Sequence, residues 1–405
     1  MAVLLDQKQS VDKCLSSVLP GTRIARISTV PFFVVTQLKN QIKALGEFGA
    51  KVTVVCSDGP EVASLMGLKG VDCVTIDIPR RISPLRDFVA LIRLFFFFKR
   101  ERIEIAHSVT PKAGLLTAIA ARFAGVPIRI HTFTGQPWVN MVGLKRWLVR
   151  SSDRLVVKLN TRCYTDSLSQ RQFLIEEGIV TGDCLGVIGL GSIAGVDIKR
   201  FSCDHFSSND NMLMRQKLHI PDDSPVLLFI GRITEDKGIR ELMGAFSLIK
   251  KARVAPHLIL VGPFDEDSGV STGISQDEIV NFPNVHLVGY SSCPESYLAI
   301  ADILCLPSYR EGFGTVVIEA AAMSVPAIGT DIYGLSDAIV DGETGLIVPV
   351  RDVQGLLKAI EKLLENKQLR VQMGKTAKRR TQTDFDSKVI SKLLAKEYCM
   401  LLKKI

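Results

Sequence analysis

The stretch that decides the fold is Pro307–Pro349, which reads PSYREGFGTVVIEAAAMSVPAIGTDIYGLSDAIVDGETGLIVP. The apolar run Ile303–Leu306 before it has the length of a strand and ends at Pro307. Thr315–Met323 is apolar and rich in alanine, which predicts a short buried helix. We therefore expect Glu311 on a loop after a strand, at the edge where open α/β sheets bind ligands.

Acidic residues and glycines alternate in this stretch in a way that suits a ligand with two kinds of polar group. Glu319 lies four residues after Thr315, on the same face as the start of the predicted helix. Gly312 and Gly314 allow close approach of the backbone, and a helix N-terminus offers N–H groups to an anion. Carboxylates can hold sugar hydroxyls while amides hold phosphate, as a sugar nucleotide requires. The alternative is that the two acids only cap the helix.

The pattern E-G-F-G-x4-E resembles the E-x7-E signature of retaining GT-B glycosyltransferases, glycosyltransferase family 4. That resemblance implies that the first acid contacts the donor sugar, the loop amides contact sugar and phosphate, and the second acid holds the ribose. The residues implied in this way are Glu311, Phe313, Gly314, Thr315 and Glu319. The sequence departs from the family at Ser324, where a glycine usually stands two residues before the proline.

Length and composition favour two globular domains. The chain has 405 residues, more than one domain usually holds, and 47% of them are hydrophobic. No apolar run is long enough to span a bilayer. Nine cysteines are scattered without a C-x2-C pair, which argues against a disulfide framework and a zinc site. This cysteine usage predicts a reducing, cytoplasmic setting and no metal site.

Charge divides the chain into unlike halves. Residues 1–200 carry 27 Lys and Arg against 16 Asp and Glu, whereas residues 201–405 carry 23 against 26. A basic first half favours an anionic partner, and nucleic acid, a membrane surface and a phosphorylated acceptor are the candidates. The sequence shows no nucleic-acid-binding signature, so we expect a partner other than nucleic acid.

The first half alternates strands with helices, which predicts a parallel, doubly wound sheet. Strands are expected at Arg23–Ile27, Lys51–Cys56, Ile103–His107 and Pro127–His131, and helices at Val34–Glu47 and Leu115–Ala124. The segments HSVTPKAGLL (107–116) and TDSLSQRQFL (165–174) resemble the N-terminal domain of the same family. The likeness is strongest to bacterial enzymes that extend surface polysaccharides or lipid-linked oligosaccharides.

Residues 85–102, LRDFVALIRLFFFFKRER, combine four consecutive phenylalanines with a cationic cluster. As a helix, this segment would present an apolar face bordered by cations, which is typical of helices that lie on a membrane. The alternative is an ordinary core helix of the first domain. The two interpretations are compatible if one end of the helix protrudes.

The catalytic histidine of the family has no direct counterpart. Many relatives carry T-x-H-G after the corresponding strand, whereas this chain reads HTFTGQPW, which places Thr134 at the usual histidine position. Thr134 is implied to contact the donor sugar by position. His131 is a candidate substitute or a strand-end residue, and His107 and Lys112 are further candidates on first-domain loops. Retaining transfer can proceed without a strong base because the leaving phosphate can take the acceptor proton.

Both tryptophans lie close together, at Trp138 and Trp147, beside Lys145, Arg146 and Arg150. Tryptophan next to cations suits a lipid–water boundary or stacking on a sugar. A packed helix face is the alternative.

The second domain carries the candidate phosphate ligands. Val226–Ile230 is a buried strand, and the resemblance implies that Arg232 and Lys237, which follow it, bind the donor diphosphate. Arg offers a fork and Lys a point charge for phosphate oxygens; the alternative is surface charges on a turn. The expected organisation is an extension at 1–22, an acceptor domain at 23–200 completed by the helix 387–405, a polar linker at 203–211, and a donor domain at 212–386.

These expectations combine into an α/β GT-B protein, with two facing Rossmann-like doubly wound domains and a donor cleft between them. The expected reaction is retaining, metal-independent transfer of a hexose or N-acetylhexosamine from a nucleoside-diphosphate sugar, UDP-sugar favoured, to a lipid-linked saccharide. No cofactor is expected beyond this co-substrate. The expected location is peripheral on an anionic membrane surface, at its cytoplasmic face. A non-hydrolysing sugar-nucleotide epimerase and a catalytically silent donor-binding subunit are the alternatives.

Overall fold

The structure, a computed structural model, describes residues 18–181, 184–249, 254–264 and 274–405. The chain forms two compact units, of which the first ends at Gly195 and is completed by Ser387–Ile405. The second unit is Val196–Asp386. Most of the extension predicted at 1–22 lies outside the described residues.

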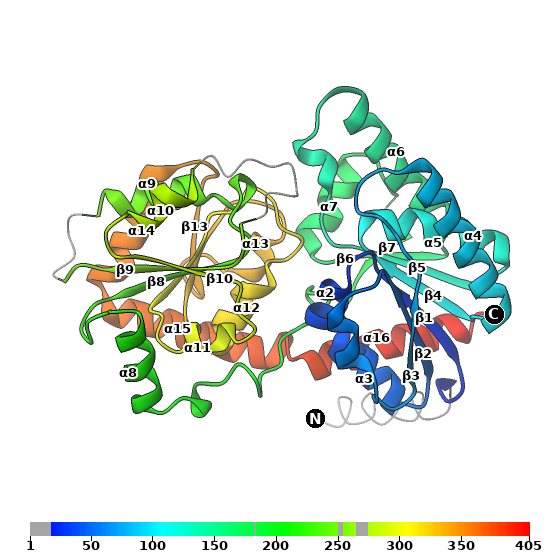
Figure 1. The fold of residues 1–405 in the computed structure, drawn as a ribbon, viewed down its shortest axis with the longest axis horizontal. Helices are drawn as coiled ribbons and strands as arrows, with labels where there is room; N and C mark the ends of the chain where they lie inside the picture. The colour runs from blue at the N-terminus through cyan, green and yellow to red at the C-terminus, as the bar shows by residue number, and fades with distance from the viewer. Residues whose placement is uncertain (1–17, 182–183, 250–253, 265–273) are drawn as a thin grey trace. The chain divides into compact units, whose positions relative to one another are not determined.

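The first unit is a parallel sheet with the strand order β3-β2-β1-β4-β5-β6-β7 (Figure 1). Its strands are β1 Arg23–Ile27, β2 Lys51–Cys56, β3 Val71–Thr75, β4 Ile105–Val109, β5 Ile128–Phe133, β6 Arg162–Thr165 and β7 Leu185–Val187. Its α-helices are α2 Pro31–Phe33, α3 Lys39–Glu47, α4 Pro84–Glu101, α5 Pro111–Ala124, α6 Gly143–Leu159, α7 Leu168–Glu176 and α16 Ser387–Leu402. A π-helical turn at Val34–Leu38 joins α2 to α3, and 3-10 turns occupy Pro60–Leu65 and Pro137–Asn140. Helices α3 and α16 pack against each other, and α5 packs against both α4 and α6.

The second unit repeats this plan with the order β10-β9-β8-β11-β12-β13. Its strands are β8 Val226–Ile230, β9 His257–Val261, β10 Val285–Gly289, β11 Ile303–Leu306, β12 Ala327–Thr330 and β13 Gly345–Val348. Its α-helices are α8 Ser208–Lys217, α9 Ile239–Ser247, α10 Gln276–Val280, α11 Pro294–Leu298, α12 Thr315–Ala322, α13 Leu335–Ala338, α14 Val353–Glu365 and α15 Lys367–Asp384. Short 3-10 turns are formed by Cys203–His205 and Glu235–Lys237. The prediction of two Rossmann-like doubly wound α/β domains is confirmed.

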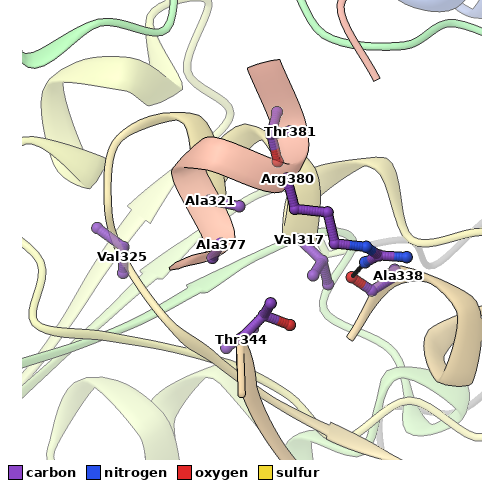
Figure 2. A pocket seen from close by; sticks show the side chains of 9 residues that line it. Val317, Ala321, Val325, Ala338, Thr344, Ala377, Arg380 and Thr381 are labelled. Atoms are coloured by element: carbon purple, nitrogen blue, oxygen red, sulfur yellow. Dashed lines mark hydrogen bonds between the residues drawn. The ribbon is translucent and has the colours of Figure 1, made fainter. Parts of the chain in front are cut away.

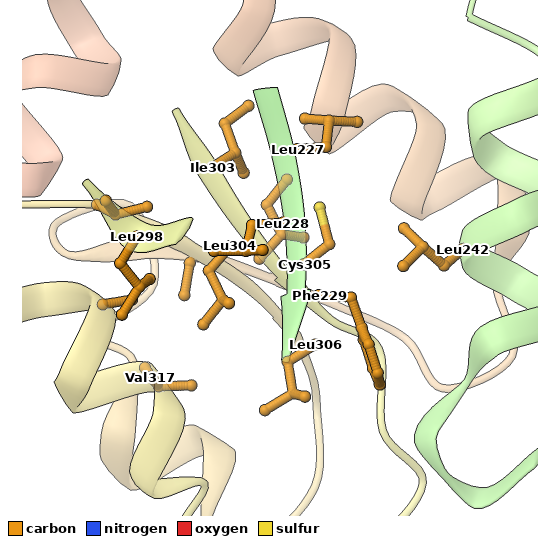
Figure 3. Close-up of a cluster of buried hydrophobic side chains, with 14 of the residues drawn as sticks. Leu227, Leu228, Phe229, Leu242, Leu298, Ile303, Leu304, Cys305, Leu306 and Val317 are labelled. Carbon is orange, nitrogen blue, oxygen red and sulfur yellow. The ribbon is translucent and has the colours of Figure 1, made fainter. Parts of the chain in front are cut away.

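The core of the second unit explains why its central strands are continuous apolar runs. Helices cover both faces of a parallel sheet, so the side chains of the central strands β8 and β11 are buried, except for the half-buried Ile230 at the end of β8. Figure 3 shows the side chains of β8 and β11 packed together with Leu242, Leu298 and Val317 from the flanking helices. This packing fixes the ends of β8 and β11, and therefore the loops that follow them.

Several predicted boundaries were wrong. Residues 208–211 of the predicted linker open helix α8, because Ser207 and Asp210 form a capping box that satisfies its first turn. Helix α5 begins at Pro111 rather than Leu115, since proline suits the first helical position. Strand β4 is Ile105–Val109 rather than Ile103–His107, and β5 runs on to Phe133, so His107 and His131 lie inside strands rather than at the predicted strand ends. Neither histidine therefore lies on a loop.

Among the described residues, no helix is both long enough and apolar enough to cross a lipid bilayer.

Candidate active site

The order of the second sheet marks where a ligand site is expected. The strand order changes direction between β8 and β11, and ligands of open α/β sheets bind beyond the carboxyl ends of the strands at such a switch point. The loop after β8 carries Arg232 and Lys237, and the loop after β11 carries Glu311. The fold therefore brings these three predicted residues to one edge of one sheet.

Lys237 and Glu311 form an ion pair although 74 residues separate them in the sequence. The side chains are 16% and 13% exposed, so the pair is largely screened from water but still accessible to a ligand. Ser308 also donates a hydrogen bond from its hydroxyl to the same Glu311 oxygen, at 2.9 Å. Two residues predicted from separate motifs thus share one polar centre.

Glycine makes this approach of the two loops feasible. Gly238 has φ +71°, and a Cβ on it would lie 2.0 Å from the carbonyl oxygen of Pro307. On the other side, a Cβ on Gly334 would lie 2.6 Å from the carbonyl oxygen of Gly312. Any larger residue at either position would push the loop that carries Glu311 out of place.

Asp236 organises the cations of this edge. Its carboxylate accepts a hydrogen bond from Thr234 at 2.5 Å and contacts Arg310 at 3.3 Å. Burial alone would raise the pKa of Asp236, but the Thr234 hydrogen bond and the charges of Lys237, Arg310 and Arg232 outweigh it and hold the pKa below its ordinary value. Asp236 stays ionised and offsets part of the positive charge gathered here.

The start of helix α12 supplies the predicted amide region. Gly314 adopts φ +78° as the N-cap, and Thr315 is the first helical residue. The Phe313 side chain is 1% exposed, with its ring 5.2 Å from that of Phe385. Its ring therefore anchors the loop in the core, which leaves only the backbone of Phe313 for the contact that the resemblance implies. The positive end of the helix dipole favours an anion at this position.

Glu319, one turn further along α12, lies in a cluster that the sequence did not reveal. Arg200 donates hydrogen bonds to Glu295 at 2.8 Å and to the carbonyl oxygen of Ser292 at 2.7 Å. Burial raises the pKa of Glu319 to about 7; the charge of Arg200 opposes this rise and that of Glu295 adds to it. Glu319 is thus a carboxyl group poised between its two protonation states near neutral pH.

The first unit holds the other predicted residues. Thr134 lies on the loop directly after β5 and is half-buried. His131 is 1% exposed, its ring packs against Gly114 of α5, and its Nδ1 is 3.0 Å from the Ser108 hydroxyl. Burial lowers the pKa of His131 to about 3, with a hydrogen bond to the Ser108 backbone opposing. This environment favours the structural interpretation of His131 over that of a substitute base.

His107 and Lys112 are likewise engaged. The His107 ring contacts the hydroxyls of Thr132 at 2.7 Å and of Tyr398, in α16, at 2.5 Å, and it also contacts Arg26. Burial first, and then the charges of Arg26 and His131, lower the pKa of His107 well below its usual value. Lys112 pairs with Asp87 at 2.7 Å, an ion pair that ties α5 to α4.

One of the two tryptophans is packed in the core, and the other is exposed. Trp138 is fully buried, donates a hydrogen bond to Asp153 at 2.7 Å and stacks on Phe173. Trp147, on α6, is 60% exposed. The packed-face interpretation therefore holds for Trp138, and only Trp147 remains available to an interface.

A small pocket behind α12 is separate from these groups. Figure 2 shows it lined by small and apolar side chains together with Arg380, whose guanidinium donates to the carbonyl oxygens of Ala338 and Asp337 at 2.8 and 2.7 Å. None of the predicted donor ligands lines this pocket. We assign it to the packing of α12 on α15.

Sequence reasoning missed the groups that support the predicted residues. Ser308, Asp236, Arg310, Arg200 and Glu295 all contact or surround them. Arg200 and Glu295 are 95 residues apart, so no local pattern could have joined them. Asp236 stands directly before Lys237 and Arg310 directly before Glu311, and a charged neighbour beside a predicted ligand was the available signal in both places. Among the described residues, no group of three or more His, Cys, Asp or Glu is arranged to hold a metal ion.

Comparisons with known proteins identify the family of both units. Residues 210–380 match the family of glycosyl transferases group 1, and residues 34–185 match the glycosyl transferase 4-like domain. The capsular polysaccharide biosynthesis glycosyltransferase CapM of Staphylococcus aureus is 31% identical over 371 residues, which cover 91% of this chain and 94% of that protein.

A second relative and a solved structure extend the likeness. The N,N'-diacetylbacillosaminyl-diphospho-undecaprenol alpha-1,3-N-acetylgalactosaminyltransferase of Campylobacter jejuni is 25% identical, covering 90% of this chain and 95% of that protein. The crystal structure of HepE from Anabaena in complex with UDP and glucose has a TM-score of 0.76 at 18% identity, covering 93% of this chain and 99% of that one. The chain belongs to the GT-B glycosyltransferases of glycosyltransferase family 4.

Proposed function

We propose that this glycosyltransferase moves a hexose or N-acetylhexosamine from a nucleoside-diphosphate sugar, UDP-sugar favoured, to a lipid-linked saccharide, with retention at the anomeric carbon. The observation that carries the proposal is the Lys237–Glu311 pair at the switch point of the second sheet, with Glu319 on the adjoining helix. Cations for a diphosphate and carboxylates for hydroxyls lie on neighbouring loops, as a sugar nucleotide requires.

Each part of the donor would contact a different group of residues in this site. Arg232 and Lys237 would hold the diphosphate, helped by the N-terminal end of α12, and Glu319 would accept hydrogen bonds from the ribose hydroxyls. Glu311 would contact the sugar. In transfer, the bond from the anomeric carbon to the phosphate oxygen breaks, and charge builds on the departing diphosphate. The two cations stabilise that charge, so the proposed reaction needs no divalent ion.

The fate of the acceptor proton favours a retaining path. A new bond forms from the acceptor oxygen to the anomeric carbon, and the acceptor proton passes to the phosphate oxygen that leaves. His107 and His131 are buried, and the pKa of each is lowered. Neither suits a general base. In this proposal Thr134 replaces the usual histidine as a contact to the donor sugar and moves no proton.

Two observations support a lipid-linked acceptor. The name of the Campylobacter relative specifies a diphospho-undecaprenol acceptor, and that of the Staphylococcus relative specifies capsular polysaccharide biosynthesis. The first 200 residues carry an excess of cations, which suits a diphosphate-bearing lipid and the anionic membrane around it. We therefore propose a role in polysaccharide biosynthesis, with peripheral attachment to the membrane.

The test is a transfer assay with isotopically labelled UDP-, GDP- and dTDP-sugars and extracted polyprenyl-diphosphate saccharides. Label in the lipid fraction is expected with one donor, and the anomeric coupling of the product, compared with that of the donor, reports retention. Epimerisation of the donor without transfer would replace the proposal with an epimerase. Tight donor binding without either reaction would identify a silent subunit. Loss of activity in EDTA, restored by Mg2+ or Mn2+, would refute metal independence.

A further inference from the structure

Helix α4 exposes an apolar stripe where a solvated helix would be polar. Four of its side chains are buried against the first unit: Ala90, Leu94, Phe97 and Phe98. Five apolar side chains on the same helix are exposed: Leu85 (83%), Phe88 (60%), Val89 (47%), Ile92 (39%) and Phe96 (64%). The exposed residues recur at steps of three and four, so they lie on one face. That face points away from the buried one.

The structure therefore divides the run of four phenylalanines. Phe97 and Phe98 belong to the core, Phe95 is half-buried, and only Phe96 is strongly exposed. Two of the four rings pack under the helix beside α5. The core interpretation and the surface interpretation are both correct, for different residues of one helix.

Helix α6 carries a second stripe of the same kind. Leu144, Trp147 and Leu148 are 71%, 60% and 51% exposed and follow the helical repeat, and Val142, just before the helix, is 85% exposed. Helices α4 and α6 both pack on α5, so the two helices that carry the stripes lie on one flank of the first unit (Figure 1). Isolated exposed apolar residues are ordinary, whereas two periodic stripes indicate an interaction surface.

Cations border both stripes. Arg86, Arg93, Lys99 and Arg100 are exposed on α4, and Lys145, Arg154 and Lys158 are exposed on α6. Trp147 stands among the α6 cations, an arrangement that suits the boundary between lipid and water. An apolar stripe edged by cations is complementary to an anionic bilayer, which accepts apolar side chains between its headgroups and attracts positive charge around them.

We propose that the stripes of α4 and α6 form a membrane-docking surface that inserts Phe88, Phe96 and Trp147 into an anionic bilayer. For its biological meaning the inference rests on the proposed lipid-linked acceptor. Docking would hold the first unit at the surface in which such an acceptor is embedded. Binding to vesicles can be measured without any transfer, so the two proposals can fail independently.

The main experiment is flotation of the full chain with vesicles of phosphatidylcholine, with and without phosphatidylglycerol. Wild type should float with the anionic vesicles and be released only in part by high salt, because salt screens the cations and leaves apolar insertion intact. Phe88→Ser with Phe96→Ser should lower the partition constant about 100-fold, roughly tenfold for each ring withdrawn. The remaining binding should then be fully released by salt.

A matched control replaces exposed apolar residues elsewhere. Met212→Ser with Leu213→Ser changes side chains that are 39% and 52% exposed on α8 of the second unit, and it should leave vesicle binding unchanged. Both variants should keep the circular dichroism spectrum and donor affinity of wild type. Arg93→Gln with Lys99→Gln should weaken binding at low salt but not the salt-resistant part.

Tryptophan fluorescence gives a second, independent readout. The chain has two tryptophans, and Trp138 is buried, so a shift on adding vesicles reports Trp147. A blue shift that is absent in Trp147→Phe supports docking through α6, and a spectrum that does not change refutes it. Wild type that stays with the soluble fraction overturns the proposal. So does concentration-dependent dimerisation that Phe88→Ser with Phe96→Ser abolishes, since the stripe would then cover a second copy of the chain.

Discussion

Glu319 offers the sharpest test of the site, because its proposed function should cost stability. Burial raises the pKa of its carboxyl group from the ordinary 4.5 to about 7. Below 4.5 the group is protonated in both the folded and the unfolded chain. As the pH rises from 4.5 to 7 the unfolded chain loses the proton first, so the free energy of unfolding falls. Above 7 the loss is complete and constant.

The size of the effect follows from the shift. A difference of about 2.5 pKa units corresponds to roughly 3 kcal/mol of stability that is absent above pH 7. Glu319→Gln keeps the shape and removes the ionisation. We therefore expect the free energy of unfolding of the variant to exceed that of wild type by about 1–3 kcal/mol near pH 8, with the difference vanishing near pH 4.5. The same variant should bind the donor roughly 10- to 100-fold more weakly, because a charge-assisted bond to the ribose is lost.

Amide hydrogen exchange of β11 and α12, measured near pH 5 and near pH 8 and corrected for intrinsic rates, reports the opening free energy of the second unit. Tryptophan fluorescence would not serve, since both tryptophans lie in the first unit. Glu295→Gln is a graded comparison: it removes a negative charge that adds to the raised pKa of Glu319, so it should reduce, but not abolish, the stability lost between the two pH values. A stability difference between Glu319→Gln and wild type that is the same at both pH values would refute the reasoning.

Four further predictions follow from the same contacts. Donor affinity of wild type should rise about tenfold from near pH 6 to near pH 8 as Glu319 ionises, and calorimetry should find a flat profile in Glu319→Gln. Lys237→Ala and Glu311→Ala should each lower kcat by orders of magnitude. The double variant should lose far less than the two effects combined, because the residues form one pair. Strictly additive losses would contradict the pairing. In urea titrations, Gly238→Ala should destabilise the second unit by roughly 1–3 kcal/mol, and it should also lower kcat. Gly244→Ala, whose Cβ would meet Val353 at 3.4 Å, should be neutral in the same titrations. Phe97→Ala should cost about 3–5 kcal/mol in thermal and urea unfolding and Phe96→Ala less than about 1 kcal/mol, and equal losses would show that α4 is packed differently.

The sequence predicted the fold well because its central strands are continuous apolar runs bounded by glycine and proline. The predicted runs Val226–Ile230 and Ile303–Leu306 are strands β8 and β11, with the same first and last residues. Errors arose where boundaries depend on local chemistry. The sequence contains the capping box at Ser207 and Asp210, but the polar composition of residues 203–211 suggested a linker. Strand β4 begins and ends two residues later than the predicted Ile103–His107, which moves His107 from the predicted strand end to the middle of a buried strand.

Other features could not be predicted because they depend on packing. The phenylalanine run is apolar on every face of a helix, so periodicity alone cannot say which rings enter the core. The contact of α4 with α5 decides it. Similarly, the tryptophans look alike in sequence, but a hydrogen bond to Asp153 and a stack on Phe173 bury one of them. The supporting residues Arg200 and Glu295 meet only through the fold.

Glu311 and Glu319, the first and last residues of the E-x7-E pattern, lie in different electrostatic environments. This difference suits them to different roles in the proposed site. Glu311 already has a cation, Lys237, and a hydroxyl donor, Ser308, so its charge is satisfied in the absence of a ligand. A donor diphosphate would have to share Lys237 with it, which links phosphate binding to the position of the carboxylate beside the sugar. Glu319 instead has a raised pKa, because burial outweighs the opposing charge of Arg200. Hydroxyl groups from a ribose would supply the hydrogen bonds that favour its ionised form. In the proposed site, one acid would therefore respond to phosphate and the other to the nucleoside, so that full ligation of the site would require both parts of the donor.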